Sequence, residues 1–124
     1  PKRSRTNTPL QALTLLKDQA YVEMALGFAV SLLEKTTGQS TTDRMVHAFR
    51  RALSRDPTDG ETEILLDLLR EQGDRLLSDR SLSKDLLSQA PDIKIPAKLD
   101  SNEVGAWFFV ANALLNLDET ITKG

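Results

Sequence analysis

The feature that most constrains this chain is a long apolar run, residues 102–117, which reads NEVGAWFFVANALLNL. It holds the sole tryptophan, Trp107, directly followed by Phe108 and Phe109. When these residues are projected on a helix, apolar side chains fall on nearly every side. A helix that is apolar all round is usually enclosed by other elements. We therefore predict that this segment is a buried helix and the packing centre of the fold.

Length and composition predict an all-α fold. The chain has 124 residues, of which 40% are apolar and 27% charged, and leucine is its commonest residue type. A chain of this size buries roughly two thirds of the surface that its unfolded form exposes, which is enough for one core. We predict a single helical domain over residues 1–124, built as an irregular bundle of five or six helices around a buried C-terminal helix.

Composition also argues against several classes of function. The chain contains no cysteine, which excludes disulfides, thiolate zinc sites, catalytic thiols and covalent c-type haem attachment within it. Its formal net charge of -2 gives no overall attraction to nucleic acid or to an anionic membrane. No segment approaches the run of about 18 uncharged apolar residues that a membrane span needs. We expect no nucleic-acid partner and no membrane span.

Capping residues indicate where the first helices begin. Thr8 is a good N-cap, Pro9 suits the first helical position, and Gln11 stands where a capping-box partner belongs. A break or kink is expected near residues 17–18, followed by a helix over residues 19–35. The expected apolar face of that second helix consists of Tyr21, Ala25, Phe28 and Leu32, flanked by Val22, Leu26, Ala29 and Leu33.

A loop over residues 36–40 should follow, with Gly38 ending the helix in a left-handed conformation. The third helix is predicted over residues 43–54, with Thr41 or Thr42 as its cap and a stop at residues 56–57. Thr58 and Glu61 form a capping box that opens a fourth helix, so the third and fourth helices should form a hairpin with a short turn.

The last third of the chain holds a short helix, a connector and the apolar run. Residues 81–89 are expected to form a short helix, and residues 90–99 an extended connector because they contain two prolines and no helical period. Either Asp100 together with Glu103, or Ser101 alone, should cap the final helix.

No arrangement of residues carries a catalytic signature. The chain lacks a G-x-S-x-G elbow, a P-loop, an H-E-x-x-H zinc motif and a dinucleotide fingerprint. His47 is the sole histidine, so we interpret it as a helix-surface or boundary residue rather than a metal ligand. No catalytic, cofactor-binding or metal-binding residue is predicted. The charged rim of the third helix consists of Arg44, Arg50, Arg51 and Arg55. Interhelical ion pairs of weak effect are expected with the acidic start of the fourth helix, namely Asp59, Glu61, Glu63 and Asp67. The carboxylates of the fourth helix are interpreted as its solvated face and not as an acid/base site: Glu61, Glu63, Asp67 and Glu71.

Two asparagines, Asn112 and Asn116, lie one helical turn apart within the apolar run. If the helix is buried, each amide needs hydrogen-bond partners, because an unpaired buried polar group costs on the order of 1 to 3 kcal/mol. We predict a structural polar cluster in which these amides meet Asn7, Thr8 and Gln11 from the other end of the chain. The alternative interpretation is a ligand-binding pair.

Three segments resemble one family. Residues 3–18 (RSRTNTPLQALTLLKD) and residues 107–119 (WFFVANALLNLDE) are similar to the two end signatures of a family abundant in planctomycetes, domain of unknown function 1553 or PSD1. Residues 43–61 (DRMVHAFRRALSRDPTDGE) are similar to its helical-hairpin segment. The chain departs from the family where residues 17–19 read KDQ instead of Asn-Asp-Pro, and where Thr120 replaces an aromatic residue.

The resemblance implies a setting for the domain. In that family it forms the C-terminal part of large, exported proteins that often carry cytochrome-c-like haem domains upstream, so we expect an extracytoplasmic location, periplasmic or at the cell surface. A start at Pro1 instead of Met fits a part of a longer protein. No cofactor is expected in this domain, although the upstream domains can hold haem.

Two functions follow from this setting. The first is a non-catalytic structural or interaction module that docks on the upstream domains of the same protein or on another protein. The second is a segment that completes an enzymatic or electron-transfer site, associated with haem, in the full-length protein.

Overall fold

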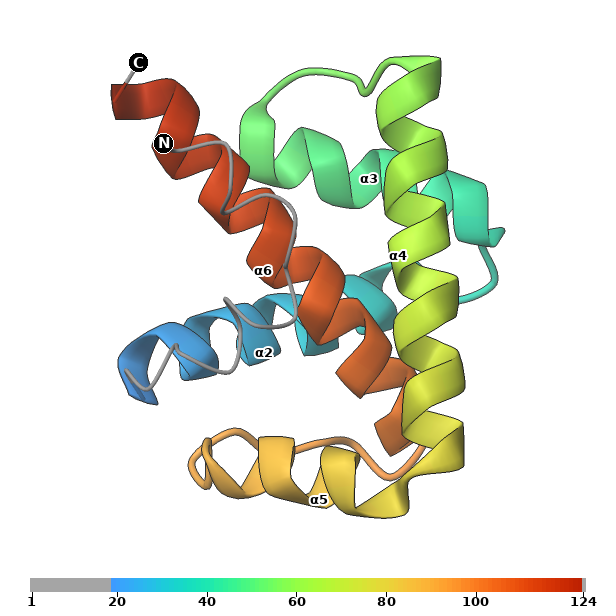
Figure 1. Ribbon diagram of the computed structural model, residues 1–124, viewed down its shortest axis with the longest axis vertical. Helices are drawn as coiled ribbons and strands as arrows, with labels where there is room; N and C mark the ends of the chain where they lie inside the picture. The colour runs from blue at the N-terminus through green and yellow to red at the C-terminus, as the bar shows by residue number, and fades with distance from the viewer. Residues whose placement is uncertain (1–18, 124) are drawn as a thin grey trace.

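The computed structural model describes the backbone of residues 19–123 and the side chains of residues 20–117. Within this range the chain forms five helices and no strand, which confirms the predicted all-α bundle (Figure 1). The helix predicted to start at Thr8 and the break near residues 17–18 lie outside the described residues. The helices are α2 (Gln19–Lys35), α3 (Thr41–Leu53), α4 (Asp59–Ser78), α5 (Arg80–Ser88) and α6 (Ser101–Lys123).

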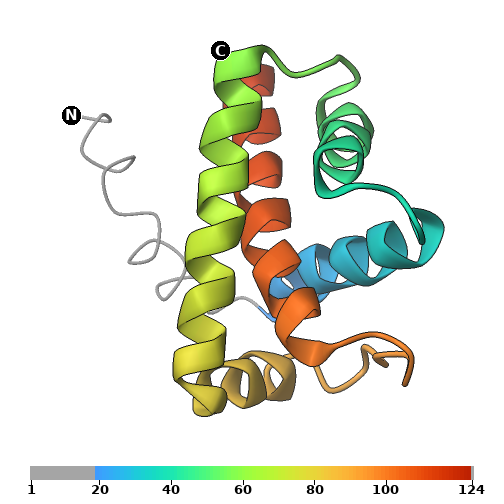
Figure 2. The ribbon, with the colours of Figure 1, turned by 90° about the vertical axis from the view of Figure 1, so that its right-hand side faces the viewer.

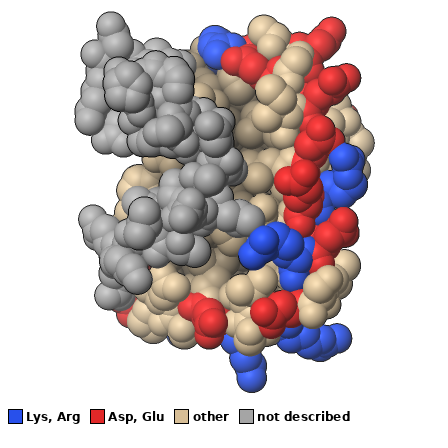
Figure 3. Space-filling view, viewed as in Figure 1, with Lys and Arg blue, Asp and Glu red and all other residues tan. Residues whose placement is uncertain are grey.

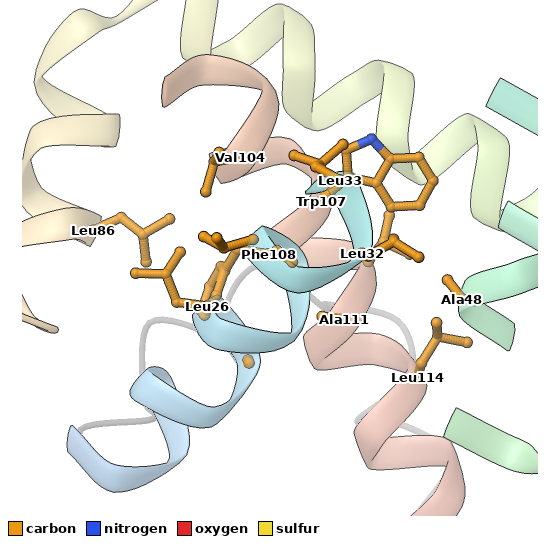
Figure 4. Close-up of a cluster of buried hydrophobic side chains, with 14 of the residues drawn as sticks. Leu26, Leu32, Leu33, Ala48, Leu86, Val104, Trp107, Phe108, Ala111 and Leu114 are labelled. Atoms are coloured by element: carbon orange, nitrogen blue, oxygen red, sulfur yellow. The ribbon is translucent and has the colours of Figure 1, made fainter. Parts of the chain in front are cut away.

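Helix α6 is the centre of the bundle, as the apolar run predicts. It packs against α2, α3, α4 and α5, and it runs through the middle of the molecule in Figure 1. Trp107 is only 2% exposed and Val110 and Leu114 are fully buried. Figure 4 shows side chains of α6 among apolar side chains of three other helices, namely Leu26, Leu32 and Leu33 of α2, Ala48 of α3 and Leu86 of α5.

Helix α2 turns a slightly different face to the core than its sequence pattern predicts. Ala25 and Leu32 are buried as expected, but Tyr21 and Phe28 are only half-buried. The buried face lies closer to the residues that were expected to flank the stripe, and it consists of Val22, Ala25, Leu26, Ala29, Val30, Leu32 and Leu33. The wide apolar arc of α2 allows either orientation, so its contacts with α6 decide which side is covered.

Local chemistry fixes the ends of α2 and α3. Gly38 has a φ of 85°, the left-handed conformation predicted for the residue that ends α2. The cap of α3 is Ser40, whose hydroxyl accepts a hydrogen bond of 3.1 Å from the Asp43 N–H, so the prediction of Thr41 or Thr42 is wrong by one or two residues. Helix α3 ends at Leu53, because Ser54 adopts a left-handed φ of 61°, before the proline that was expected to stop it.

The capping box of α4 is confirmed in full. The Glu61 N–H donates to the Thr58 hydroxyl at 3.1 Å, and the Thr58 N–H donates to Glu61 Oε1 at 2.9 Å. At the other end of α4 a single residue, Asp79, breaks the helix and caps α5 through a 3.0 Å bond from the Ser81 N–H. Two helices with no loop between them thus meet at a corner, seen at the bottom of Figure 1.

Helices α3 and α4 do not form the predicted hairpin. They pack on each other, but α3 lies across the direction of α4 in Figure 1. The place alongside α4 is taken by α6, as Figure 2 shows. Gly105 allows this close approach, since a Cβ at that position would come within 2.9 Å of Leu76 Cδ1. The physical reason for the wrong prediction is that α6, an apolar helix far along the chain, competes with α3 for the buried face of α4.

The connector between α5 and α6 covers the core instead of merely crossing the surface. It contains two tight turns, closed by hydrogen bonds from the Ile93 N–H to the Ala90 carbonyl and from the Leu99 N–H to the Pro96 carbonyl. Ala90 is only 1% exposed. The Val104 N–H donates to the Asp100 carbonyl at 2.9 Å, so Asp100 stands at the predicted cap position of α6.

Candidate functional site

The two asparagines of α6 lie together on one face of the helix and join it to α2. Asn116 Nδ2 donates to Asn112 Oδ1 at 3.5 Å, and the Tyr21 hydroxyl donates to Asn116 Oδ1 at 3.0 Å. A spacing of four residues brings side chains on a helix next to each other, which explains the first contact. The second spans 95 positions in sequence and fixes α6 against α2.

Asn112 is the most deeply placed amide. Its exposure is 0%, and its Nδ2 has no hydrogen-bond acceptor among the described side chains of residues 20–117 or the backbone of residues 19–123. An unpaired buried donor costs on the order of 1 to 3 kcal/mol. The packing of α6 in the core therefore keeps the Asn112 amide buried, although only its Oδ1 accepts a described hydrogen bond.

Two of the five residues of the predicted polar cluster, Asn112 and Asn116, lie within the described side chains. Asn7, Thr8 and Gln11 lie outside the described residues, so their contact with the amides stays a prediction. The structure brings Asn112 and Asn116 together as their spacing indicates, and it adds Tyr21. Sequence reasoning placed Tyr21 in an apolar stripe, although its hydroxyl was the available signal that it needs a polar partner.

A second polar arrangement, centred on Arg44, ties the end of α2 to the start of α6. The Arg44 side chain is only 13% exposed. Its Nε donates to Thr36 Oγ1 at 2.7 Å, and its NH2 group donates to the Thr36 carbonyl at 3.0 Å. Its NH1 group pairs with Glu103 Oε2 at 3.2 Å. A cation is also favourable beside the C-terminal carbonyls of α2. The sequence pattern counted Arg44 among surface arginines, and no local signal shows its partners.

The predicted ion pairs between the third and fourth helices occur at their connection. Arg55 contacts both carboxylate oxygens of Glu61, at 3.0 and 2.9 Å. These hydrogen bonds, helped by the one from the Thr58 N–H, lower the pKa of the Glu61 carboxyl from 4.5 to about 2. The guanidinium of Arg55 also lies 4.8 Å from the centre of the Phe49 ring. The arrangement is a structural clamp across the turn.

An open hollow lies on α3, near the end of the helix. It is lined by His47, Arg50, Arg51 and Ser54, with a volume of about 390 Å³. His47 is half-buried, in agreement with its interpretation as a boundary residue. Within residues 20–117 no three His, Asp or Glu side chains gather in a way that could hold a metal ion. The described helices are also too short or too polar to cross a membrane.

Comparison with known proteins gives one result. The family PSD1, described as protein of unknown function (DUF1553), matches residues 1–69, which is more than half of the chain. Neither the curated proteins nor the solved structures give a significant match. The family match ends within α4, whereas the core continues through α5 and α6. The resemblance recognised in the sequence is thus confirmed, and the chain belongs to the PSD1 family of proteins of unknown function.

Proposed function

We propose that this chain is a non-catalytic helical module that docks on the other domains of a larger, extracytoplasmic protein. The observation that carries the proposal is that several polar side chains form hydrogen bonds and ion pairs that join parts of this chain to one another. Arg44 joins α2 to α6, Arg55 closes the turn before α4, and Tyr21 joins α2 to Asn116. These side chains thus use their hydrogen bonds to stabilise the fold, which is expected of a structural module.

The outer surface supports a polar mode of docking. Within residues 20–117, four large apolar side chains are exposed, but they are distributed over α2, α4 and α6: Met24, Ile64, Leu77 and Leu117. Single exposed apolar residues are ordinary on protein surfaces. Charged side chains are more concentrated, since acidic groups follow α4 along the right side of Figure 3. Interfaces between domains of one chain are typically polar, which fits such a surface.

The proposal is tested by removing these 124 residues from the full-length protein. We expect the remainder to lose thermal stability and to bind the separately produced chain when the two are mixed, as measured by calorimetry. A remainder that melts at the same temperature as the intact protein and fails to bind the chain would contradict a docking role.

Two further parts of the proposal rest on the family resemblance. We propose an exported protein with upstream cytochrome-c-like domains that hold the haem. Cell fractionation and a haem stain of the full-length protein test these parts separately from docking. A cytoplasmic protein without covalent haem would refute both and leave the docking proposal standing.

Asn112 favours a second candidate function, in which the segment completes an enzymatic or electron-transfer site of the full-length protein. A buried amide without an acceptor is the kind of group that a partner could use. Asn112→Asp in the full-length protein should then change the haem spectrum or redox potential while the melting temperature of the haem domains stays the same. Unchanged spectra and potential would leave the amide a purely structural role.

A further inference from the structure

The hollow on α3 is lined by four described residues, each with a side chain that can donate hydrogen bonds. His47, Arg50, Arg51 and Ser54 follow one another at spacings of three, one and three, so they share one side of the last two turns of α3. A guanidinium group offers several N–H donors in a planar fork, and the imidazole and the hydroxyl each add one donor. Such a set of donors suits an anion with several oxygens.

Arg51 contributes one positive charge to the hollow. Its guanidinium carbon lies 5.0 Å from the centre of the Phe28 ring, and its NH1 group donates to Ser31 Oγ at 3.4 Å. Both contacts come from α2, so they hold the side chain across the gap between the helices. No carboxylate within residues 20–117 forms an ion pair with Arg51. The structure thus holds a cation in place without neutralising it.

Arg50 adds a second cation whose present partner is easily displaced. Its Nε lies 3.2 Å from Asp56 Oδ1, and the two side chains are 67% and 73% exposed. Ion pairs at such exposed positions contribute little stability because water and salt compete with them. An anion that contacts Arg50 and Arg51 together can therefore replace Asp56 at low cost.

One effect opposes anion binding, namely the partial negative charge of the carbonyls at the end of α3. The Ser54 N–H donates to the Arg50 carbonyl at 2.8 Å and so satisfies one of them. The left-handed conformation of Ser54 ends the helix at the rim of the hollow. The full positive charges of Arg50 and Arg51 exceed the partial negative charge of about one half at the end of the helix.

We propose that this hollow binds a phosphate group, through Arg50 and Arg51 with hydrogen bonds from Ser54 and His47. A tetrahedral oxyanion presents oxygens in several directions, which matches donors that reach the hollow from different positions, and arginine is well suited to phosphate. The phosphate is either the free ion or a phosphate ester on a larger molecule.

The test is a titration of the isotopically labelled chain, followed by amide chemical shifts at constant ionic strength. Inorganic phosphate, glycerol phosphate and acetate are added separately. We expect saturable shifts in residues 47–54 with phosphate and about tenfold weaker binding in Arg51→Gln, the loss expected for one charged hydrogen-bonding partner. Tighter binding of glycerol phosphate than of inorganic phosphate would identify an ester as the ligand, and equal binding would identify the free ion.

Arg70→Gln is the matched control, because Arg70 is as exposed as Arg50, at 67%, but lies on α4. It should bind phosphate like the unmodified chain. Arg50→Gln is a second test variant that leaves the contacts of Arg51 with α2 intact. Shifts that do not saturate, an equal loss in Arg70→Gln, unchanged affinity in both Arg50→Gln and Arg51→Gln, or equally tight binding of acetate would each overturn the proposal.

Discussion

Gly105 of α6 faces Leu76 of α4 so closely that any side chain at position 105 would displace Leu76. A Cβ there would lie 2.9 Å from Leu76 Cδ1 and 3.5 Å from its Cδ2. Leu76 is itself only 1% exposed, so it has little room to move. The two longest helices of the described bundle, α4 and α6, can therefore lie this close together because residue 105 has no side chain.

Substitution of this glycine should destabilise the fold despite a gain in helix propensity. We expect Gly105→Val to lower the melting temperature by several degrees, because overpacking a core typically costs about 1 to 3 kcal/mol. Gly60→Ala is the control, since a Cβ at position 60 would meet no described atom within 4 Å apart from its own stretch of helix, and alanine is favoured over glycine in helices by up to about 1 kcal/mol. A Gly105→Val protein that melts at or above the original temperature would show that α4 and α6 are not closely packed.

Asn112 can be replaced in two ways that separate its volume from its polarity. Asn112→Ala should lower the melting temperature because it opens a cavity at a fully buried position. Asn112→Leu fills a similar volume and removes the unpaired Nδ2, so it should be more stable than Asn112→Ala. Thermal denaturation of both variants gives the comparison. If Asn112→Leu were the less stable of the two, the amide would need a polar partner.

The clamp between Arg55 and Glu61 should make stability depend on pH. The bonds from Arg55, aided by the Thr58 N–H, lower the pKa of Glu61 to about 2, whereas the unfolded chain titrates near 4.5. The folded state thus binds fewer protons between these values. The stabilisation is complete above pH 4.5 and is lost as the pH falls toward 2.

Glu61→Gln should therefore reduce the melting temperature at pH 7 and have a smaller effect at pH 3, as followed by circular dichroism. In a protein that already carries Arg55→Gln, the effect of Glu61→Gln on the melting temperature should differ less between pH 7 and pH 3. The reason is that the hydrogen bonds from Arg55 are the largest cause of the lowered pKa of Glu61. A Glu61→Gln deficit of equal size at both pH values would mean that the carboxylate contributes nothing through its charge.

The hydrogen bonds of Arg44 require a guanidinium and not merely a positive charge. Lysine cannot reproduce contacts to Thr36 Oγ1, the Thr36 carbonyl and Glu103 from one planar group. We expect Arg44→Lys to cost about 1 to 3 kcal/mol in the free energy of unfolding, measured with urea. Arg70→Lys, at an exposed pair with Asp67, should change it by less than about 1 kcal/mol. If Arg44→Lys and Arg70→Lys changed the free energy of unfolding equally, the hydrogen bonds of Arg44 would add no more stability than an exposed ion pair.

Features set by neighbouring residues could be predicted from the sequence. The Thr58 and Glu61 capping box and the left-handed Gly38 both depend on a few consecutive positions. The cap of α3 was misplaced because residues 40–42 are all hydroxyl residues with similar capping ability. Local chemistry thus gives the helices to within a few residues.

Features that join distant helices could not be predicted in the same way. The spacing of Asn112 and Asn116 revealed their contact, but nothing near Tyr21 or Arg44 in sequence indicates a partner on α6. The hairpin prediction failed for the same reason, since α6 lies far along the chain from the face of α4 that it covers. Such contacts depend on which helices pack against each other in the folded bundle, and no short stretch of sequence specifies that.

The central position of α6 has a consequence for synthesis of the protein. Helices α2, α3 and α4 leave the ribosome before the helix that covers their apolar faces exists. Contacts such as that between Tyr21 and Asn116 join residues 95 positions apart, and distant contacts slow folding because a long loop must close first. The nascent chain thus exposes this apolar surface until α6 emerges, and exposed apolar surface during folding favours aggregation and chaperone binding.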